Sequence, residues 1–434
     1  MELHYHDRQN LMISPNTARL IKNCKILVIG VGAGGNEILK NLLLMGFGNF
    51  TIVDFDTVED TNLSRTTLFR KEDIGKSKSF VAAERLKEMA LHENPNILGL
   101  QGNLMTDFGK GLFVEHDIVI SCVDTQQCRA YINDWCVRTK TPFFEMGFEK
   151  YTVNITFFAP DGPMQQNNGE IIDKLPSSDG RFPKMLGEFP VCLREEIGYG
   201  DFDGKRNSCS GFKVRDENFE KIPTIQVSAA MAGTLIATEL VKYLSGIDSI
   251  RNKMLLYSGL TYETVQVGYR RSPKCIIHDE HFEIEVVNVP VNPTLKELLQ
   301  MVEQKYHAQA LLKLPDKIAL TGQCLNCGKT IILNKRANDI YTDDCWCSDC
   351  KDYNSKTDDP RYKKAFIKTS VPIEISLLNV EEEILNLHCQ EISLPKDDIY
   401  KVILVKNDIS IEKFIYFKVY ADKKEINNRI SSSR

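Results

Sequence analysis

Apolar runs alternate with amphipathic stretches over residues 1–150 of the chain. Short apolar runs predict strands, and the stretches between them have the spacing of helices. The predicted strands are 25–29, 50–53, 98–102, 116–121 and 142–145, and the predicted helices are 17–23, 36–44, 79–91 and 126–139. This alternation predicts a doubly wound, Rossmann-like α/β sheet, in which ligands bind beyond the carboxyl ends of the strands.

The first predicted strand runs into a glycine-rich turn, Gly30-Val31-Gly32-Ala33-Gly34-Gly35. Spaced glycines permit a tight turn and let backbone N–H groups approach a phosphate at a helix N-terminus. Asp56 follows the second strand, about 20 residues after Gly35, where an acid meets ribose hydroxyls in this type of fold. The turn and the acid together predict a nucleotide site that includes Gly30, Gly32, Gly35 and Asp56.

Polar residues behind Asp56 favour ATP over a dinucleotide. Asn62, Arg65 and Lys78 lie in predicted loops at the same edge of the sheet. Guanidinium and ammonium groups bind phosphate oxygens, and a dehydrogenase has no need of them at this place. Asp124 follows the fourth strand and is suited to Mg²⁺, which takes one or two carboxylates plus phosphate oxygens. We therefore expect ATP with Mg²⁺, and an NAD-dependent enzyme is the alternative from another class.

Residues 4–280 resemble the adenylation domain of the ThiF, MoeB and ubiquitin-activating enzyme family. The motifs that carry the resemblance occur in the family's order: Gly30–Gly35, Val53–Val58, Asn62–Arg65, Asp73–Lys78 and Ser121–Asp124. The resemblance implies that Asp56 binds ribose and that Asp124 holds Mg²⁺. It implies phosphate contacts for Asn62, Arg65 and Lys78. It also implies that Arg8 reaches the ATP of the other subunit in a homodimer.

The implied reaction is attack by the C-terminal carboxylate of a protein ending in glycine on the α-phosphate of ATP. Positioned cations such as Arg65 and Lys78 stabilise charge in such a reaction, and no acid–base pair is needed. In ubiquitin-type enzymes a cysteine then takes the acyl group as a thioester. In MoeB- or ThiF-like enzymes, which activate a sulfur-carrier protein, the reaction stops at the adenylate. A non-catalytic scaffold is disfavoured because it would not need to keep these phosphate ligands.

Two cysteines lie in the polar, irregular stretch 160–222, which resembles the family's crossover loop. Cys209 lies between Lys205-Arg206 and Lys213, and nearby cations raise the thiolate fraction of a cysteine. We therefore predict Cys209 as the nucleophile. Cys192 lies in Phe189-Pro190-Val191-Cys192, which is similar to the Phe-Pro-x-Cys of longer ubiquitin-type enzymes, but acids follow it. Cys192 is the alternative, and a protein with no thioester cysteine is the other.

Family members often carry a structural zinc on two Cys-x-x-Cys pairs. The second pair corresponds to Cys275-Ile276-Ile277-His278, whereas Met164-Gln165-Gln166 stands where the first pair is expected. Either this zinc is lost, or Cys192 and Cys209 complete it with Cys275 and His278. Our hypothesis from the sequence is that the zinc is lost and Cys209 is free to react.

The pattern changes past residue 280, so we expect an adenylation domain at 1–280 and a second domain at 281–434. Cys324-x-x-Cys327 and Cys347-x-x-Cys350 are 19 residues apart, which is typical of a zinc ribbon, here about residues 320–352. Cys345 could replace Cys347, but Cys347 has the proper spacing. Four thiolates make a closed structural site, and we expect zinc there.

Strand-like segments at 282–290, 400–405 and 414–420 and helix-like segments at 294–306 and 380–389 surround the ribbon. They predict a small α+β domain. Such a domain is similar to the ubiquitin-fold domain that recruits conjugating enzymes in this family, so a conjugating enzyme is a further expected partner.

The composition of the chain limits the classes of protein to which it can belong. The chain has 434 residues, enough for two or three domains, and its net charge of −5 offers no overall attraction to nucleic acid or an anionic membrane. It has no apolar run of membrane-spanning length and no secretory h-region. Its 13 cysteines, an odd number in an unsecreted chain, suggest thiols and metal rather than disulfides. We expect a cytoplasmic protein without nucleic-acid or membrane partners.

Overall fold

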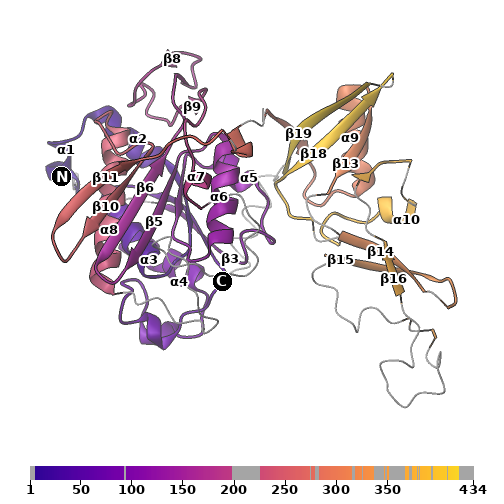
Figure 1. Ribbon diagram of the computed structural model, residues 1–434, viewed down its shortest axis with the longest axis horizontal. Coiled ribbons are helices and arrows are strands. Elements are labelled where there is room, and N and C mark those ends of the chain that lie inside the picture. The colour runs from indigo at the N-terminus through magenta and orange to yellow at the C-terminus, as the bar shows by residue number, and fades with distance from the viewer. Residues whose placement is uncertain are drawn as a thin grey trace. The chain divides into compact units, whose positions relative to one another are not determined.

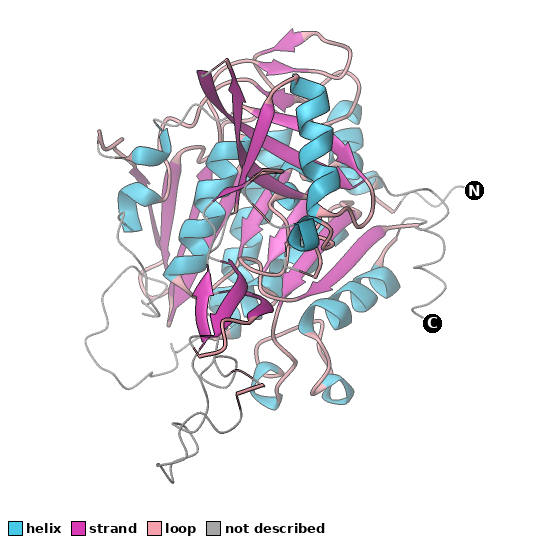
Figure 2. Ribbon diagram, turned by 90° about the vertical axis from the view of Figure 1, so that its right-hand side faces the viewer, coloured by secondary structure: helices cyan, strands magenta, loops and turns pink. Residues whose placement is uncertain are grey.

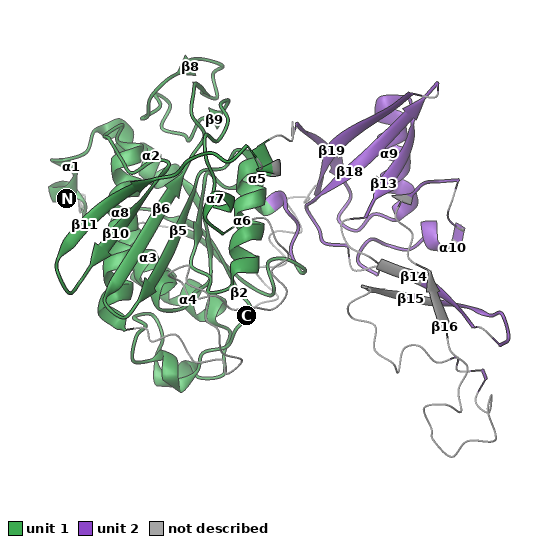
Figure 3. Ribbon diagram, viewed as in Figure 1, with its two compact units in different colours: residues 1–107, 112–281 green, residues 108–111, 282–434 purple. Residues whose placement is uncertain are grey.

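The computed structural model describes residues 5–91, 94–197, 225–273, 275–278, 283–314, 318–324, 326–336, 347, 349–350, 367–370, 374–378, 380, 382–391, 394–407 and 409–419. The chain forms two compact units (Figure 3). Unit 1 comprises Met1–Asp107 and Leu112–His281, and unit 2 comprises Phe108–Gly111 and Phe282–Arg434. The chain therefore leaves unit 1 at Asp107, contributes a short segment to unit 2, and returns at Leu112.

An eight-stranded sheet forms the centre of unit 1 (Figure 1). The five strands β3, β2, β1, β4 and β5 run parallel, and β6, β10 and β11 are antiparallel to their neighbours. This arrangement confirms the predicted α/β sheet, and its strand order reverses direction between β1 and β4. Across the sheet the strands are β11 (Glu263–Gly268), β10 (Lys253–Ser258), β6 (Thr152–Phe158), β5 (Phe143–Glu149), β4 (Ile118–Ser121), β1 (Lys25–Ile29), β2 (Asn49–Asp54) and β3 (Asn96–Gln101).

Helices flank this sheet on both faces (Figure 2). α3, α4 and α8 lie together and pack against strands β1–β3, β5 and β6, whereas α6 packs against β4 and β5 from the other side. The helices of unit 1 are α1 (Asp7–Asn10), α2 (Pro15–Asn23), α3 (Ala33–Leu44), α4 (Lys78–Met89), α6 (Gln126–Thr139), α7 (Arg194–Ile197) and α8 (Gln226–Leu244), with the 3₁₀ turns η1 (Asp60–Asn62), η2 (Lys71–Asp73) and η3 (Ile276–His278). A further short helix, α5, spans Gly111–Glu115.

α8 is a core helix of unit 1. By its length and composition this helix could cross a membrane. That is weak evidence for a membrane span, because 56% of its apolar 18-residue window is buried inside the protein. It packs closely on α3, because a Cβ on Gly233 would lie 2.9 Å from the Cβ of Glu37. Gln226 also donates a hydrogen bond to the Glu37 carboxylate at 2.9 Å. These contacts give the apolar face of α8 a partner within the protein.

The stretch after residue 160 is more ordered than its polar sequence predicts. Up to Ile197 it contains α7 and a small sheet in which β7 (Met164–Gln165) pairs with β8 (Ile171–Ile172) and β9 (Lys184–Met185). Buried Gln166 supports the sheet, because its side-chain oxygen accepts hydrogen bonds from the N–H and hydroxyl of Ser178. The expectation of an irregular stretch is therefore wrong for this part, because Met164, Leu175 and Met185 are buried in the core of unit 1 although the surrounding sequence is polar.

Unit 2 contains a five-stranded sheet of β12 (Ile284–Val289), β19 (Ile409–Val419), β18 (Asp398–Lys406), β13 (Gln309–Lys313) and β17 (Glu374–Ile375). α9 (Leu295–Tyr306) packs on it through Leu295, Leu298, Leu299 and Val302. The helix begins with a capping box, in which Thr294 and Glu297 each accept a hydrogen bond from the other's backbone N–H. The predicted helix at 380–389 is much shorter, being the single turn α10 (Glu382–Leu385).

A buried ion pair joins the short segment 108–111 to the rest of unit 2. The Lys110 ammonium lies 3.0 Å from the Asp398 carboxylate, whose side chain is fully buried. The Lys110 N–H also donates to Asp398 at 2.8 Å, and the Gly111 N–H donates to the carbonyl oxygen of Asp397 at 2.8 Å.

A second sheet of unit 2 consists of β15 (Thr330–Arg336), β14 (Ile318–Cys324) and β16 (Ile367–Ser370).

Candidate functional site: the glycine turn and two cysteine clusters

The glycine turn and the loop after β4 are in close contact at the carboxyl edge of the sheet. A Cβ on Gly30, where φ is +90°, would lie 2.6 Å from the carbonyl oxygen of Cys122. A Cβ on Gly35 would lie 2.1 Å from the carbonyl oxygen of Gly30. Only glycine fits these two positions. A Cβ on Gly32 would meet no atom within 4 Å, so the space in front of the turn is open.

The N-terminus of α3 opens onto this space. Gly32 is its N-cap residue, and no side chain there caps the helix. The first N–H groups of a helix lack intrahelical partners, and the helix dipole favours an anion beside them. A helix end of this kind is suited to a phosphate group.

Asp54 and Asp56 follow the same strand, yet they have different surroundings. The Asp54 carboxylate accepts hydrogen bonds from the N–H of Val31 at 2.6 Å and of Asp56 at 2.8 Å. Burial raises the pKa of Asp54, and these contacts fix the glycine turn to the end of β2. The Asp56 side chain is 49% exposed. Asp56 is therefore the acid that a ligand can reach.

Lys78 is held at the same place. It is the first residue of α4, and its ammonium lies 2.8 Å from the Asp56 carboxylate, although its side chain is only 10% exposed. Its N–H also donates to the carbonyl oxygen of Asp56. The loop between them is closed at its base by the bridge between Thr57 and Ser77. Asp56 and Lys78 thus form one charged pair just beyond the carboxyl end of β2.

Asn62 and Arg65 lie in that loop. The side-chain oxygen of buried Asn62 accepts a hydrogen bond from the N–H of Glu59 at 3.0 Å, which orders η1. The amide of an asparagine also carries two N–H donors. The Arg65 guanidinium is partly buried and donates to the carbonyl oxygen of Thr61 at 2.6 Å. Both side chains therefore lie in an ordered loop.

Asp124 is exposed just beyond β4, and a buried arginine fixes the residue before it. Arg129, from α6, donates two hydrogen bonds to the carbonyl oxygen of Val123, at 3.2 and 3.1 Å, and one to that of Met146 at 3.2 Å. Its guanidinium also lies 3.1 Å from the Glu145 carboxylate. Sequence reasoning missed Arg129 and Glu145. The signal available was a lone acid inside the apolar strand 143–146.

The roles of two further predicted residues, Arg8 and Cys209, stay predictions. Arg8 is exposed on the short helix α1 of unit 1. Its contact with a second subunit stays a prediction, since a single chain is described. Cys209 lies outside the described residues, and its role also stays a prediction.

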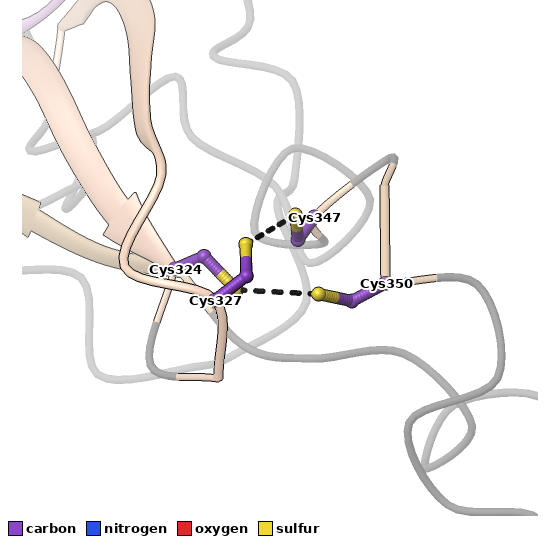
Figure 4. A group of neighbouring side chains, drawn as sticks. All are labelled: Cys324, Cys327, Cys347 and Cys350. Carbon is purple, nitrogen blue, oxygen red and sulfur yellow. Dashed lines mark hydrogen bonds between the residues drawn. The ribbon is translucent and has the colours of Figure 1, made fainter.

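The four predicted ribbon cysteines come together in unit 2 (Figure 4). The Cys324 and Cys350 sulfurs are 3.8 Å apart, as are those of Cys327 and Cys347. Zinc bound tetrahedrally with Zn–S distances of about 2.3 Å would place its sulfurs about 3.8 Å apart. The backbone N–H of Cys327 lowers the pKa of Cys324 to about 6. The donor set and its spacing fit a Cys₄ zinc site.

A second cluster contains the alternative nucleophile, Cys192. Its sulfur lies 3.8 Å from that of Cys275, and His278 and Glu195 complete a group whose ligand atoms all lie within 4.8 Å of one another. The contact with Cys275 and burial both raise the pKa of the Cys192 thiol far above its usual range. Cys192 is thus a buried thiol among potential metal ligands. Sequence reasoning had considered Cys209 in this group, but did not include Glu195.

Comparison with known proteins places the chain in a family. The ThiF family profile matches residues 6–276. SUMO-activating enzyme subunit 2 of Dictyostelium discoideum is 39% identical over 140 residues, which are 32% of this chain and 21% of that protein. The sulfur carrier protein adenylyltransferase of Thermus thermophilus is 26% identical over 291 residues, which are 66% of this chain and 95% of that protein.

The chain thus spans about a fifth of the SUMO-activating relative and nearly all of the sulfur-carrier relative. Among solved structures, Escherichia coli MccB with ATP has a TM-score of 0.45 and 20% identity, with 64% of this chain and 75% of that chain covered. The family profile covers more than half of the chain and includes the glycine turn, Asp56, Lys78 and Asp124. The chain belongs to the ThiF family.

Proposed function

We propose that this chain is an ATP-dependent adenylyltransferase that activates the C-terminal carboxylate of a ubiquitin-like protein and then accepts the acyl group on Cys209. The arrangement at the ends of β1 and β2 carries the proposal. It combines an open helix N-terminus with an accessible acid, Asp56, and an ammonium group, Lys78, 2.8 Å from that acid. A site of this kind suits a ligand with ribose and several phosphates.

Each residue has a separate part in binding ATP. Asp56 accepts hydrogen bonds from the ribose hydroxyls, while the first N–H groups of α3 bind phosphate oxygens. Lys78 is released from Asp56 toward the phosphates, where the Arg65 guanidinium and the Asn62 amide also donate. Asp124 is exposed at the end of β4 and would hold Mg²⁺ together with phosphate oxygens. The ion would neutralise phosphate charge.

Adenylation then needs little more than positioning. A carboxylate oxygen of the partner protein bonds to the α-phosphorus, the bond from that phosphorus to the bridging oxygen breaks, and pyrophosphate leaves with the electron pair. No proton is transferred, so donors and cations aimed at the phosphates are sufficient. This fits a site whose described residues supply Lys78, Arg65 and backbone N–H groups.

Thioester formation follows on Cys209. The thiolate attacks the acyl carbonyl carbon, the bond to the AMP oxygen breaks, and AMP leaves. The cations at Lys205-Arg206 and Lys213 favour the thiolate at the pH of the cell. Cys192 is a poor alternative because it is buried beside Cys275.

A second candidate is a sulfur-carrier adenylyltransferase that stops at the acyl-adenylate. The Thermus relative supports this candidate, because the match covers 95% of its length. The partner again ends in a carboxylate that is adenylated, and the two candidates differ only in the fate of the adenylate. A conjugating enzyme is a further partner only if the thioester forms.

Two assays test these candidates on the full chain. Pyrophosphate–ATP exchange that depends on a glycine-ending ubiquitin-like protein is expected for both, and exchange without any such protein, or nicotinamide binding instead, contradicts both. A thiol-labile adduct on a non-reducing gel is expected only for the first candidate. The adduct should vanish in Cys209→Ala and persist in Cys128→Ala, a matched control. An adduct that survives Cys209→Ala contradicts the assignment of that cysteine.

A further inference from the structure

Four donor side chains meet in a buried cluster of unit 1. Cys192 and Cys275 are 0% and 1% exposed, and the side chains of Glu195 and His278 are 4% and 3% exposed. Cys192 precedes α7 and Glu195 lies in it, whereas Cys275 precedes η3 and His278 ends it. Two short turns, 83 residues apart in the chain, thus each supply a pair of donors at x₂ spacing.

The spacing of the donor atoms is that of a tetrahedral zinc site. The two sulfurs are 3.8 Å apart, the same separation as in the Cys₄ cluster of unit 2. The His278 Nε2 and a Glu195 oxygen are 3.2 Å apart. With Zn–N and Zn–O distances of about 2.0–2.2 Å, a tetrahedron places these two atoms about 3.3–3.5 Å apart. Both measured edges are close to those of a metal site.

The groups around the cluster hold the donors in place. The other Glu195 oxygen accepts the Cys192 N–H at 2.8 Å, which leaves the oxygen near His278 for a metal. Asn133, on α6, accepts the Leu193 N–H at 2.8 Å. Supporting hydrogen bonds of this kind orient metal ligands.

Zinc would remove most of the buried charge of the cluster. Two thiolates, a carboxylate and a neutral imidazole carry three negative charges, and Zn²⁺ reduces them to one. Arg194, in α7, does not supply the missing cation, because its guanidinium pairs with Asp134 at 2.5 Å. Without a metal ion the ionised donors would be buried anions without a cation, which is costly.

The two Cys-x-x-Cys pairs that the family resemblance implies do not fit this chain. Where the first pair would stand, Met164 and Gln165 form strand β7. Cys192 and Glu195 come from a later turn and approach the second pair from α7. The donor set of this chain is therefore its own.

We infer that Cys192, Glu195, Cys275 and His278 bind one zinc ion in a closed Cys₂–His–Glu site, and that this role keeps Cys192 from accepting the acyl group. Zinc replaces the two thiol protons, and the four protein donors fill its coordination sphere. The site joins α7 to the segment after β11, so it fixes the last described turn before Cys209. The statement about acyl transfer rests on the proposed function, whereas the metal site does not.

Zinc counting on the purified full chain tests the site. After loading with zinc chloride and gel filtration, we expect two zinc ions per chain by elemental mass spectrometry. Cys324→Ser/Cys327→Ser should remove the ribbon zinc and leave one. Adding Cys275→Ser and His278→Ala to that background should remove the second. The inference is overturned if the Cys324→Ser/Cys327→Ser variant holds no zinc. It is also overturned if thiol counting finds two fewer free thiols in that variant because Cys192 and Cys275 form a disulfide.

A variant that gains a ligand avoids any question of misfolding. In the Cys324→Ser/Cys327→Ser variant loaded with Co²⁺, only the site in unit 1 is expected to hold metal. Glu195→Cys adds a third thiolate to that site, so the thiolate-to-cobalt absorption should rise about 1.5-fold. Glu196→Cys is the matched control on the same helix, because the Glu196 carboxylate instead accepts a hydrogen bond from Tyr269 at 2.7 Å. Equal spectra for the two variants overturn the assignment of Glu195.

Thiol labelling tests the statement about Cys192. In the zinc-loaded ribbon variant, iodoacetamide should leave Cys192 unmodified, and removal of zinc by a chelator should make it reactive. Labelling of Cys192 at equal rates in both states contradicts its role as a ligand. These measurements use neither ATP nor a partner protein, so a failure of adenylation leaves them unchanged, and an empty site leaves the adenylation proposal standing.

Discussion

The guanidinium of Arg129 lies 3.1 Å from the carboxylate of Glu145, and the two side chains are 10% and 5% exposed. Arg129 also holds the carbonyl oxygens of Val123 and Met146. Val123 precedes Asp124, and the Met146 sulfur would lie 2.4 Å from a Cβ on Gly34. One buried ion pair therefore supports both the proposed Mg²⁺ ligand and the glycine turn.

Loss of Arg129 should destabilise unit 1 strongly. Arg129→Met leaves Glu145 buried without its cation, and breaking a buried pair in this way costs about 3 kcal/mol or more. The free energy of unfolding in urea measures this loss. The double variant Arg129→Met/Glu145→Leu should recover part of it, while Arg138→Met, in the last turn of the same helix, should cost little. Equal losses for Arg129→Met and Arg138→Met contradict the prediction.

Glu145 should make stability depend on pH. Burial raises its pKa to about 7 from the usual 4.5, although Arg129 acts to lower it. Because the folded state binds this proton more tightly than the unfolded state, the contribution is complete below pH 4.5 and is lost as the pH rises to about 7. Relative to Glu145→Gln, the wild-type Tm should therefore fall between about pH 5 and about pH 8. A constant difference in Tm over that range contradicts the assignment.

Lys78 should matter for the chemical step more than its neighbour Lys76. Lys78→Ala removes a preorganised cation from the phosphates, and loss of one such group lowers kcat about 10²-fold. Lys76→Ala is the matched control, since its side chain is 59% exposed and pairs with Asp73. Pyrophosphate–ATP exchange measures both variants. Similar rates for the two would show that Lys78 does not contact the phosphates.

Arg8 should act in the site of a second copy of the chain. Arg8→Ala and Lys78→Ala are each expected to lose most of their activity in pyrophosphate exchange. Mixed and allowed to exchange subunits, they should regain activity, because one site of the mixed dimer then has both side chains. Full activity of Arg8→Ala alone, or no recovery on mixing, contradicts the proposed homodimer site.

The ribbon of unit 2 should be separable from adenylation. Cys324→Ser/Cys327→Ser removes two of four zinc ligands, and structural zinc modules lose their fold without metal. We expect loss of the ribbon zinc by elemental analysis and an unchanged rate of pyrophosphate exchange, since the proposed ATP ligands are all in unit 1. A large fall in exchange would show that the ribbon takes part in adenylation.

The parallel part of the sheet could be predicted because its signals are local. Four of the five parallel strands, β1, β2, β4 and β5, are mostly buried apolar runs, and α6 was predicted with its observed bounds. β11 could not be predicted, because all six of its residues are exposed and it is fixed by pairing with β10. The helix expected at 380–389 shows the reverse case, because its apolar spacing continues beyond the single turn that forms.

The residues of the candidate site likewise fall into those that the sequence predicts and those that only the structure reveals. Asp56 and the ribbon cysteines were predicted from the spacing of short motifs, and Lys78 from its charge and the family resemblance. The structure brings the four ribbon cysteines together and pairs Lys78 with Asp56, whereas the roles of Asp56 and Lys78 in binding ATP stay predictions. Arg129 with Glu145, and Glu195 with His278, meet only after folding, and neither pair has a fixed spacing along the chain. The buried role of Asp54, whose carboxylate accepts the Val31 N–H, could not be predicted from the sequence.

The short segment 108–111 has a consequence for the order in which the protein is made. Its Lys110 is synthesised long before Asp398, the carboxylate with which it pairs. Its Gly111 packs closely on β19, since a Cβ there would lie 2.5 Å from the Tyr416 side chain. Unit 1 can complete its sheet on the ribosome once β11 has emerged, but unit 2 must wait for the last described strand before its earliest piece finds a partner. Residues 282–434 alone would bury Asp398 without its cation, so the second unit cannot be inherited, transplanted or expressed as one continuous gene segment without losing that pair.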